Sequence, residues 1–166
     1  MKKIAIIVGH NERSQGAQSI EPINRSEFDF NSELAEIMLA KACEFNVELK
    51  IFNREYQGSY TNEIIKVYGK VNDWNADYST ELHFNSAVFT VAGSEVLTSG
   101  SAKSIKFAEL TQAELVKLFD RKGKTDRGVK IRKKGSRGYQ SLISGRAPAI
   151  IVEPFFLFVV EHGSVH

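Results

Sequence analysis

The stretch KIAIIVGHNERSQGA, residues 3–17, sets an apolar run directly before a glycine and a histidine. Ile4–Val8 is continuously apolar, which is typical of a strand that is covered on both faces of a sheet. Gly9 ends the run and His10 follows at once. This arrangement predicts a buried strand that delivers His10 to a loop, either as a hydrogen-bonded structural residue or as a ligand whose partners come from elsewhere in the chain.

The rest of the chain alternates between helix and strand patterns. Strands are predicted at 47–52, 94–99 and 149–156, with Pro154 closing the last one, and 78–87 is predicted as a strand that runs into a loop. Helices are predicted at 60–74, 101–119 and 139–144. Another helix is expected from Ser26, its N-cap, with an apolar side made of Phe30, Leu34, Ile37, Met38 and Cys43. The alternation predicts an α/β sandwich with a central, mostly parallel or mixed sheet flanked by helices, built as a single domain over residues 1–166.

Length and composition agree with such a domain and exclude few functions. The chain has 166 residues, of which 42% are hydrophobic and 25% charged, with a net charge of only +2. No apolar run approaches the ~20 residues of a membrane span, so we expect no stable membrane insertion. The short run after Met1 ends at Gly9, which indicates a strand and not a signal peptide. We therefore expect synthesis in the cytoplasm without an export signal.

Three polar residues fall at the ends of predicted strands, where sites of open α/β sheets gather. His10 follows the first strand, His83 lies in ELHFN, and Glu153 interrupts the apolar run AIIVEPFF. Glu27, at the start of the first helix, could simply favour the helix dipole. Either histidine could be structural. Glu153 is harder to explain in that way, because a buried, unpaired carboxylate is costly.

Together these residues match a known chemical requirement. Cys43 is the only cysteine, so a metal site would have to use His, Asp and Glu. Two imidazoles and one carboxylate can hold Zn²⁺ and leave one position open for water. A second carboxylate can take the proton of that water. His10 and His83, with Glu27 and Glu153, supply such a set.

Four blocks of the sequence, taken in order, resemble one family. VGHNERSQGA resembles a strand, Gly-His and a loop ending in Gly-Ala, and SEFDFNSELAEIM resembles a block with Glu four residues before Asn, here Glu27 and Asn31. ELHFNSA resembles Ser-Ile-His-Ala-Asn-Ala, and APAIIVEPFFL resembles Met-Pro-Ala-Val-Leu-Val-Glu-x-Gly-Phe-Leu. These blocks are similar to those of the zinc-dependent N-acetylmuramoyl-L-alanine amidases called amidase 3.

The resemblance implies an enzyme that cleaves the amide between N-acetylmuramic acid and L-alanine in peptidoglycan, in the manner of a phage lysin. It implies that His10, Glu27 and His83 bind Zn²⁺ and that Glu153 is the catalytic carboxylate. Asn85, two residues after His83, could hydrogen-bond substrate or steady the loop that carries this ligand. Arg146 could meet a carboxylate of the stem peptide, although an exposed arginine is the simpler interpretation. Peptidoglycan is then the partner, with no nucleic acid, and the chain is expected to be a monomer that acts on the bacterial cell wall.

Several alternatives stay open at this point. Glu21 and Glu33 lie close enough to Glu27 in sequence to be rival ligands, and only the spacing to Asn31 favours Glu27. The family has Asp-Pro before Gly-His, where this chain has Ile7-Val8. In the family's last block a Gly stands two residues after the Glu, where this chain has Phe155. These changes leave the loop shapes, and hence the substrate preference, open. The chain could also be an amidase-fold binding module without turnover.

The segment 120–137 carries nine Lys and Arg residues against two Asp. It could attract an anionic wall polymer, although a solvated loop and strand is the simpler interpretation and the one we favour. The same run could serve a nucleic-acid-binding domain. That interpretation is weaker, because aromatic residues are not interleaved with the charges.

Overall fold

A six-stranded mixed sheet organises the residues that the computed structural model describes, which are 1–19, 23–87, 92–119 and 126–158. Its strands, in sheet order, are β2 (Val47–Asn53), β1 (Lys2–Val8), β3 (Tyr78–Leu82), β7 (Ala149–Glu153), β5 (Ser94–Thr98) and β6 (Asp126–Ile131). The first four are parallel, whereas β5 is antiparallel to β7 and parallel to β6. A small second sheet pairs β4 (Asn85–Ala87) with β8 (Phe156–Phe158).

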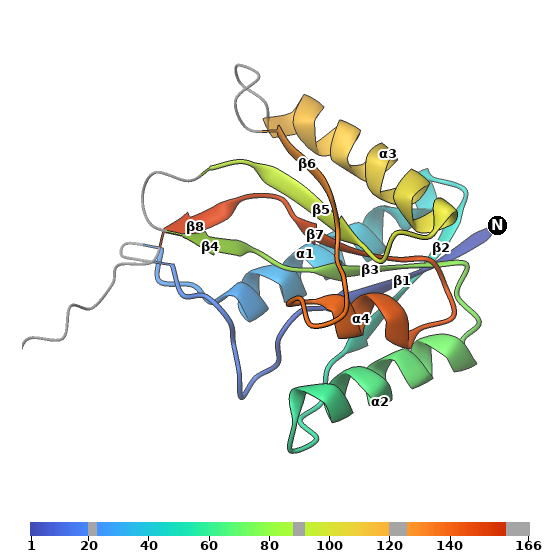
Figure 1. The fold of residues 1–166 in the computed structure, drawn as a ribbon, viewed down its shortest axis with the longest axis horizontal. Coiled ribbons are helices and arrows are strands. Elements are labelled where there is room, and N and C mark those ends of the chain that lie inside the picture. The colour runs from blue at the N-terminus through green and yellow to red at the C-terminus, as the bar shows by residue number, and fades with distance from the viewer. Residues whose placement is uncertain (20–22, 88–91, 120–125, 159–166) are drawn as a thin grey trace, which may run out of the picture.

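Helices cover both faces of the large sheet, which confirms the predicted α/β fold (Figure 1). They are α1 (Glu27–Lys41), α2 (Tyr60–Asp73), α3 (Ala102–Phe119) and α4 (Tyr139–Ser144), with a short 3₁₀ helix at Ala42–Glu44. Strand residues alternate between the faces: Ile6 and Val8 pack with α1, whereas Ile7 packs with α2. Within the described ranges, no helix has both the length and the apolar character needed to cross a bilayer.

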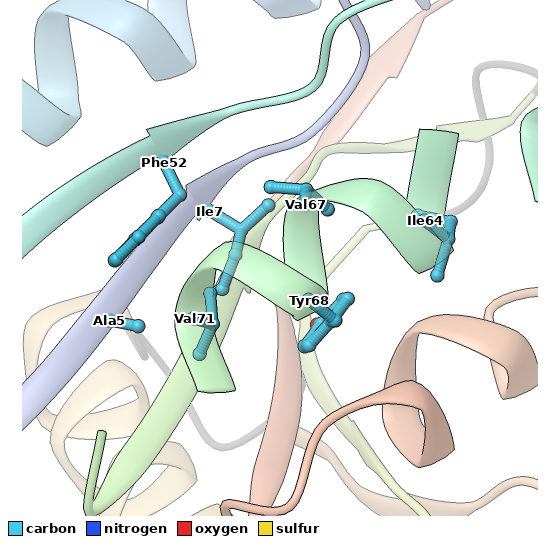
Figure 2. Packing of buried hydrophobic residues seen from close by; sticks show 7 residues of the cluster. All are labelled: Ala5, Ile7, Phe52, Ile64, Val67, Tyr68 and Val71. Carbon is cyan, nitrogen blue, oxygen red and sulfur yellow. The ribbon is translucent and has the colours of Figure 1, made fainter. Parts of the chain in front are cut away.

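A well-buried hydrophobic core lies under α2 (Figure 2). Figure 2 shows side chains of α2 meeting side chains of β1 and β2: Ala5, Ile7, Phe52, Ile64, Val67, Tyr68 and Val71. Most of these side chains are essentially excluded from solvent. This packing fixes α2 against the strands whose carboxyl ends carry the site described below.

Helix α1 buries part of the side that was expected. Ser26 is its N-cap as predicted, and its hydroxyl accepts a hydrogen bond from the backbone N–H of Asp29 at 3.1 Å. The buried residues are Glu27, Asn31 and Ala35, spaced four apart. The predicted Leu34 and Met38 pack against the core on this same side. Ile37 is 47% exposed and Cys43 is exposed beyond the end of α1, so the prediction was wrong for these two residues.

Two strands leave the large sheet where the sequence predicted a loop or a break. Residues 78–87, predicted as a strand running into a loop, form β3 and then the short strand β4. The last predicted strand ends as β7 at Glu153, before Pro154, and β8 begins at Phe156. Pro154 follows β7 directly, and because proline has no N–H it cannot continue the hydrogen-bond ladder. The chain therefore leaves the large sheet at Glu153 and pairs again only in the small sheet.

The adjacent residues Ile64 and Ile65 give a matched test of this core. Ile64 is fully buried and Ile65 is 56% exposed on the same helix. We expect Ile64→Ala to lower the free energy of unfolding by about 2–5 kcal/mol, because it removes buried methyl groups and leaves a cavity. Ile65→Ala should change it by less than about 1 kcal/mol. Urea unfolding followed by circular dichroism measures both, and equal losses would contradict this placement of α2.

Candidate active site

The site lies where three parallel neighbouring strands end. His10 follows β1, His83 follows β3 directly, and Glu153 is the last residue of β7. Because β1, β3 and β7 are adjacent and parallel, their carboxyl ends share one edge of the sheet. The structure therefore brings together the strand-end residues that the sequence singled out.

Glu27 joins the two histidines in one cluster. One ligand atom from each of His10, Glu27 and His83 can be chosen so that all lie within 4.8 Å of one another. Glu27 Oε1 lies 2.9 Å from His83 Nδ1, and Glu27 Oε2 lies 3.2 Å from His10 Nε2. The two imidazole rings meet edge to face, with centroids 5.0 Å apart. Two nitrogens and a carboxylate thus converge on one small volume.

The Glu27 carboxylate is buried yet held ionised. Burial alone would raise its pKa, but the close polar contacts and the charges of His10 and His83 outweigh burial and hold the pKa well below its usual range. Two backbone N–H groups also donate to it, from Ala17 at 3.1 Å and from Phe84 at 2.8 Å. Glu27 therefore ties α1 to the loop after β1 and to the segment after β3.

Two glycines permit the close approach of these segments. A Cβ on Gly9 would lie 2.2 Å from the carbonyl oxygen of Leu82 and 2.6 Å from a ring carbon of His83. A Cβ on Gly16, whose φ is +76°, would lie 2.5 Å from Glu27 Oε2 and 2.7 Å from a ring carbon of His10. A side chain at either position would therefore clash with the residues of the site.

His83 has a second carboxylate partner that the sequence analysis did not single out. Its Nε2 lies 3.0 Å from Oε1 of Glu81, which is fully buried on β3. Burial would lower the pKa of His83, but hydrogen bonds and charges from Glu27 and Glu81 raise it to about 9. Glu81 also accepts a hydrogen bond from the Tyr68 hydroxyl at 3.2 Å. It stands where the resembling family has Ser, so no motif pointed to it.

A buried polar network supports Glu81 from behind. Arg54, directly after β2, lies 3.7 Å from Glu81 and 2.9 Å from Glu63 on α2. Glu63 also accepts a hydrogen bond from the side chain of Asn11, whose Oδ1 accepts backbone N–H groups of the loop after His10. The network thus links the supports of both histidines across β2 and α2.

The donor set suits a metal ion. His10 Nε2 is buried and, although within ion-pair distance of Glu27, has no hydrogen bond of good geometry among the described residues. His83 Nδ1 and a Glu27 oxygen face the same volume, while Glu81 holds the other nitrogen of His83. A carboxylate behind a histidine is the usual support of a metal-bound imidazole. Two imidazole nitrogens and a carboxylate oxygen fit Zn²⁺.

Glu153 faces the same region but lies outside the three-residue cluster. Burial and the neighbouring charge of Glu95 raise its pKa to about 7, while His83 and Arg132 oppose that rise. Glu95 lies opposite Glu153 in the pairing of β5 and β7. Glu153 Oε2 is buried without a hydrogen-bond partner among the described residues. A carboxyl group with a pKa near neutrality can both accept and release a proton.

The two expected substrate-binding residues lie in different places. Asn85 lines the cleft beside the site, and its amide donates to Glu95 Oε1 at 2.9 Å. Arg146 lies before β7, at the opposite end of that strand from Glu153, and its guanidinium donates to the backbone oxygen of Asn72 at 2.7 Å. It is not among the residues that line the cleft.

The rival ligands to Glu27 do not enter the cluster. Glu33 is exposed on α1, where its carboxylate pairs with Arg25. Glu21 lies outside the described residues. Within those residues, Glu27 is the acid that reaches both histidines.

A cleft of about 730 Å³ opens in front of the site. His10, His83 and Glu153 line it together with the aromatic rings of Tyr56 and Tyr60. The basic segment 120–137 is described from residue 126 onward, and it divides in two. Arg132 and Arg137 line the cleft, whereas Lys133 and Lys134 are exposed and do not line it.

Residues 4–162 match the sequence pattern of the amidase 3 family, described as N-acetylmuramoyl-L-alanine amidase. The match therefore covers nearly the whole chain. No curated protein sequence matches the chain significantly.

Solved structures share the fold. The catalytic domain of the CD27L endolysin targeting Clostridia difficile is 26% identical, with a TM-score of 0.75 over 94% of this chain and 82% of that one. An N-acetylmuramoyl-L-alanine amidase from Clostridium difficile 630 is 21% identical, with a TM-score of 0.74 over 93% of this chain and 80% of that one.

Cwp6 from Clostridium difficile is 20% identical, with a TM-score of 0.78 over 94% of this chain. The chain spans 24% of the length of Cwp6, so it corresponds to one part of that protein. At identities of 20% and 21%, these likenesses describe the fold alone.

In protein freed of metal by a chelator, we expect His83 to titrate at a raised pKa, because the carboxylates of Glu27 and Glu81 flank its ring. Because its folded pKa of about 9 lies above the ordinary 6.5, the charged ring stabilises the fold below pH 6.5. That contribution is lost as the pH rises through about 9. NMR of the histidine ring protons should give a His83 midpoint near 9, and Glu81→Gln should lower it. A midpoint at or below 6.5 would contradict the geometry.

Proposed function

The chain belongs to the amidase 3 family of N-acetylmuramoyl-L-alanine amidases, and from this premise we propose that it is a zinc-dependent peptidoglycan hydrolase. Its reaction is hydrolysis of the amide between the lactyl group of N-acetylmuramic acid and L-alanine. The observation that carries the proposal is the convergence of His10, Glu27 and His83 beside a cleft that also holds Glu153. The catalytic unit is proposed to be one domain over residues 1–166.

The proposed zinc ligands are His10 Nε2, His83 Nδ1 and the Glu27 carboxylate. The Nε2 atom of His10 supports this assignment, because it is buried and makes no well-aligned hydrogen bond among the described residues. Glu81 keeps the Nε2 proton of His83 and so orients Nδ1 toward the ion. Binding would displace the Nδ1 proton of His83, so zinc affinity should rise with pH.

When bound, Zn²⁺ supplies Lewis acidity that polarises the scissile carbonyl and makes a water more acidic. Glu153 takes a proton from the attacking water while the oxygen of that water bonds to the carbonyl carbon. It then delivers that proton to the alanine nitrogen as the carbon–nitrogen bond breaks. The products are a lactyl carboxylate and a free α-amino group. A pKa of about 7 suits both transfers near neutral pH.

We further propose that the chain acts on the bacterial cell wall in lysis. The support is its 26% identity to the catalytic domain of the CD27L endolysin, with which it shares nearly its full length. A binding module without turnover is the alternative, and the assay below separates the two functions.

Glu153→Gln provides the sharpest test of the proposed reaction. The amide keeps the shape of the side chain but cannot accept a proton, so the rate should fall by about two to four powers of ten. The variant should fold, hold about one zinc per chain and still bind cell walls. Release of L-alanine amino termini from purified walls measures activity, and elemental analysis measures zinc.

His83→Ala is the matched control, since it should lose both zinc and activity. Chelation should abolish the activity of the unmodified protein, and zinc should restore it. Wall binding without release of amino termini by the zinc-loaded, unmodified protein would favour the binding module. Near-normal activity of Glu153→Gln would overturn the mechanism, and loss of its zinc would make Glu153 a ligand.

A further inference from the structure

The cleft contains more positive charge than the proposed chemistry uses. Four arginines line it: Arg13, Arg54, Arg132 and Arg137. Arg54 is neutralised by Glu63. The other three have no carboxylate within ion-pair distance among the described residues, and Arg13 instead lies over the ring of Tyr56 at 4.1 Å. A cleft lined by arginines that have no carboxylate at ion-pair distance favours an anionic ligand.

Arg132 is the most deeply placed of the three. It follows β6 directly, and its backbone N–H donates to the carbonyl of Thr98 at 2.8 Å, which fixes its backbone against the sheet. Its side chain is half-buried, and its Nε is buried without a hydrogen-bond partner among the described residues. A buried, unpaired guanidinium nitrogen is costly and calls for an explanation.

Arg127, on β6, differs from Arg132 because its guanidinium has a partner within the fold. Its Nε donates to Glu95 Oε2 at 2.8 Å, so its charge is already satisfied within the fold. Arg132 instead turns toward the cleft that contains Glu153, and its charge opposes the rise in the pKa of that carboxyl group. Arg132 is therefore close enough to the proposed reaction centre to meet the part of the substrate next to the cleaved bond.

The chemistry of the stem peptide supplies a suitable anion there. Its second residue is a glutamic acid joined to the rest of the stem through its side-chain carboxyl, which leaves the α-carboxyl either free or amidated. Two residues span at most about 7 Å, so this group is the first carboxylate beyond the scissile amide. A guanidinium recognises a carboxylate through paired, charge-assisted hydrogen bonds, which an amide cannot reproduce.

We propose that Arg132 binds the free α-carboxylate of the second stem-peptide residue, and that the enzyme therefore prefers stems in which this group is not amidated. The inference rests on the proposed function and adds a specificity-determining residue to it. Arg13 and Arg137, nearer the solvent, add positive charge around the mouth of the cleft.

The test compares two synthetic muramyl peptides that differ only at this α-carboxyl group, which is free in one and amidated in the other. The zinc-loaded protein should show a kcat/KM at least about tenfold higher for the free acid, as expected for a hydrogen bond to a charged group. Arg132→Gln should lose this preference by losing activity on the acid alone, and Arg132→Lys should keep part of it. Lys133→Gln, an exposed neighbour outside the cleft, should keep the full preference.

Equal kcat/KM values for the two peptides in the unmodified protein would overturn the inference and leave the proposed function standing. An equal loss on both peptides in Arg132→Gln would also overturn it, because that result marks a structural role. If neither peptide is cleaved, the proposed function fails. The inference is then tested by the affinities of the two peptides for the zinc-loaded Glu153→Gln protein. Tighter binding of the acid, lost on adding Arg132→Gln, would support it, and equal binding would overturn it.

Discussion

The buried carboxylate of Glu27 is the interaction on which the rest of the site depends. At 1% exposure it needs compensating partners, and it finds them in two histidines and two backbone N–H groups. These partners come from the loop after β1 and from the segment after β3. The ionised side chain therefore joins two strand ends to the start of α1, and Gly9 and Gly16 leave the space for that junction.

Asn31 extends the same constraint along the helix. It lies one turn after Glu27, fully buried, and its amide donates to the carbonyl of Leu82, the residue before His83. The spacing between Glu27 and Asn31 thus has a structural cause, because both residues face the end of β3. Behind His83, the buried charges of Glu81, Arg54 and Glu63 form a second layer that α2 holds in place.

The sequence predicted the parts of this site that depend on strand ends. An apolar run followed by Gly-His, and an acid inside another apolar run, predicted strand-end positions for His10 and Glu153, and the structure has both residues there. Parallel strands bring such positions to a common edge of the sheet. Sequence periodicity does not encode strand direction, so the reversal of β5 and β6 was not predictable. Glu81 was also missed, since its partners Tyr68 and Arg54 lie on other elements.

The positions of Arg146 and Arg132 relative to the strands could have been inferred from the sequence. Arg146 precedes β7, so it had to lie at the end of that strand opposite to Glu153. In the sequence, Arg132 was one of nine basic residues in the segment 120–137. Because it follows β6 directly, it lines the cleft, whereas the neighbouring Lys133 is exposed outside the cleft. The inward side of α1 was predicted in part: Leu34 and Met38 pack against the core, but the polar Glu27 and Asn31 share that side, which apolar periodicity does not reveal.

The central claim is that His10, Glu27 and His83 form one zinc site. An anomalous-difference map at the zinc absorption edge, from crystals of the zinc-loaded protein, tests it most directly. The account predicts one strong peak between the three side chains, about 2.0–2.2 Å from two imidazole nitrogens and a Glu27 oxygen. A peak elsewhere, or none at this cluster in zinc-loaded crystals, would contradict it.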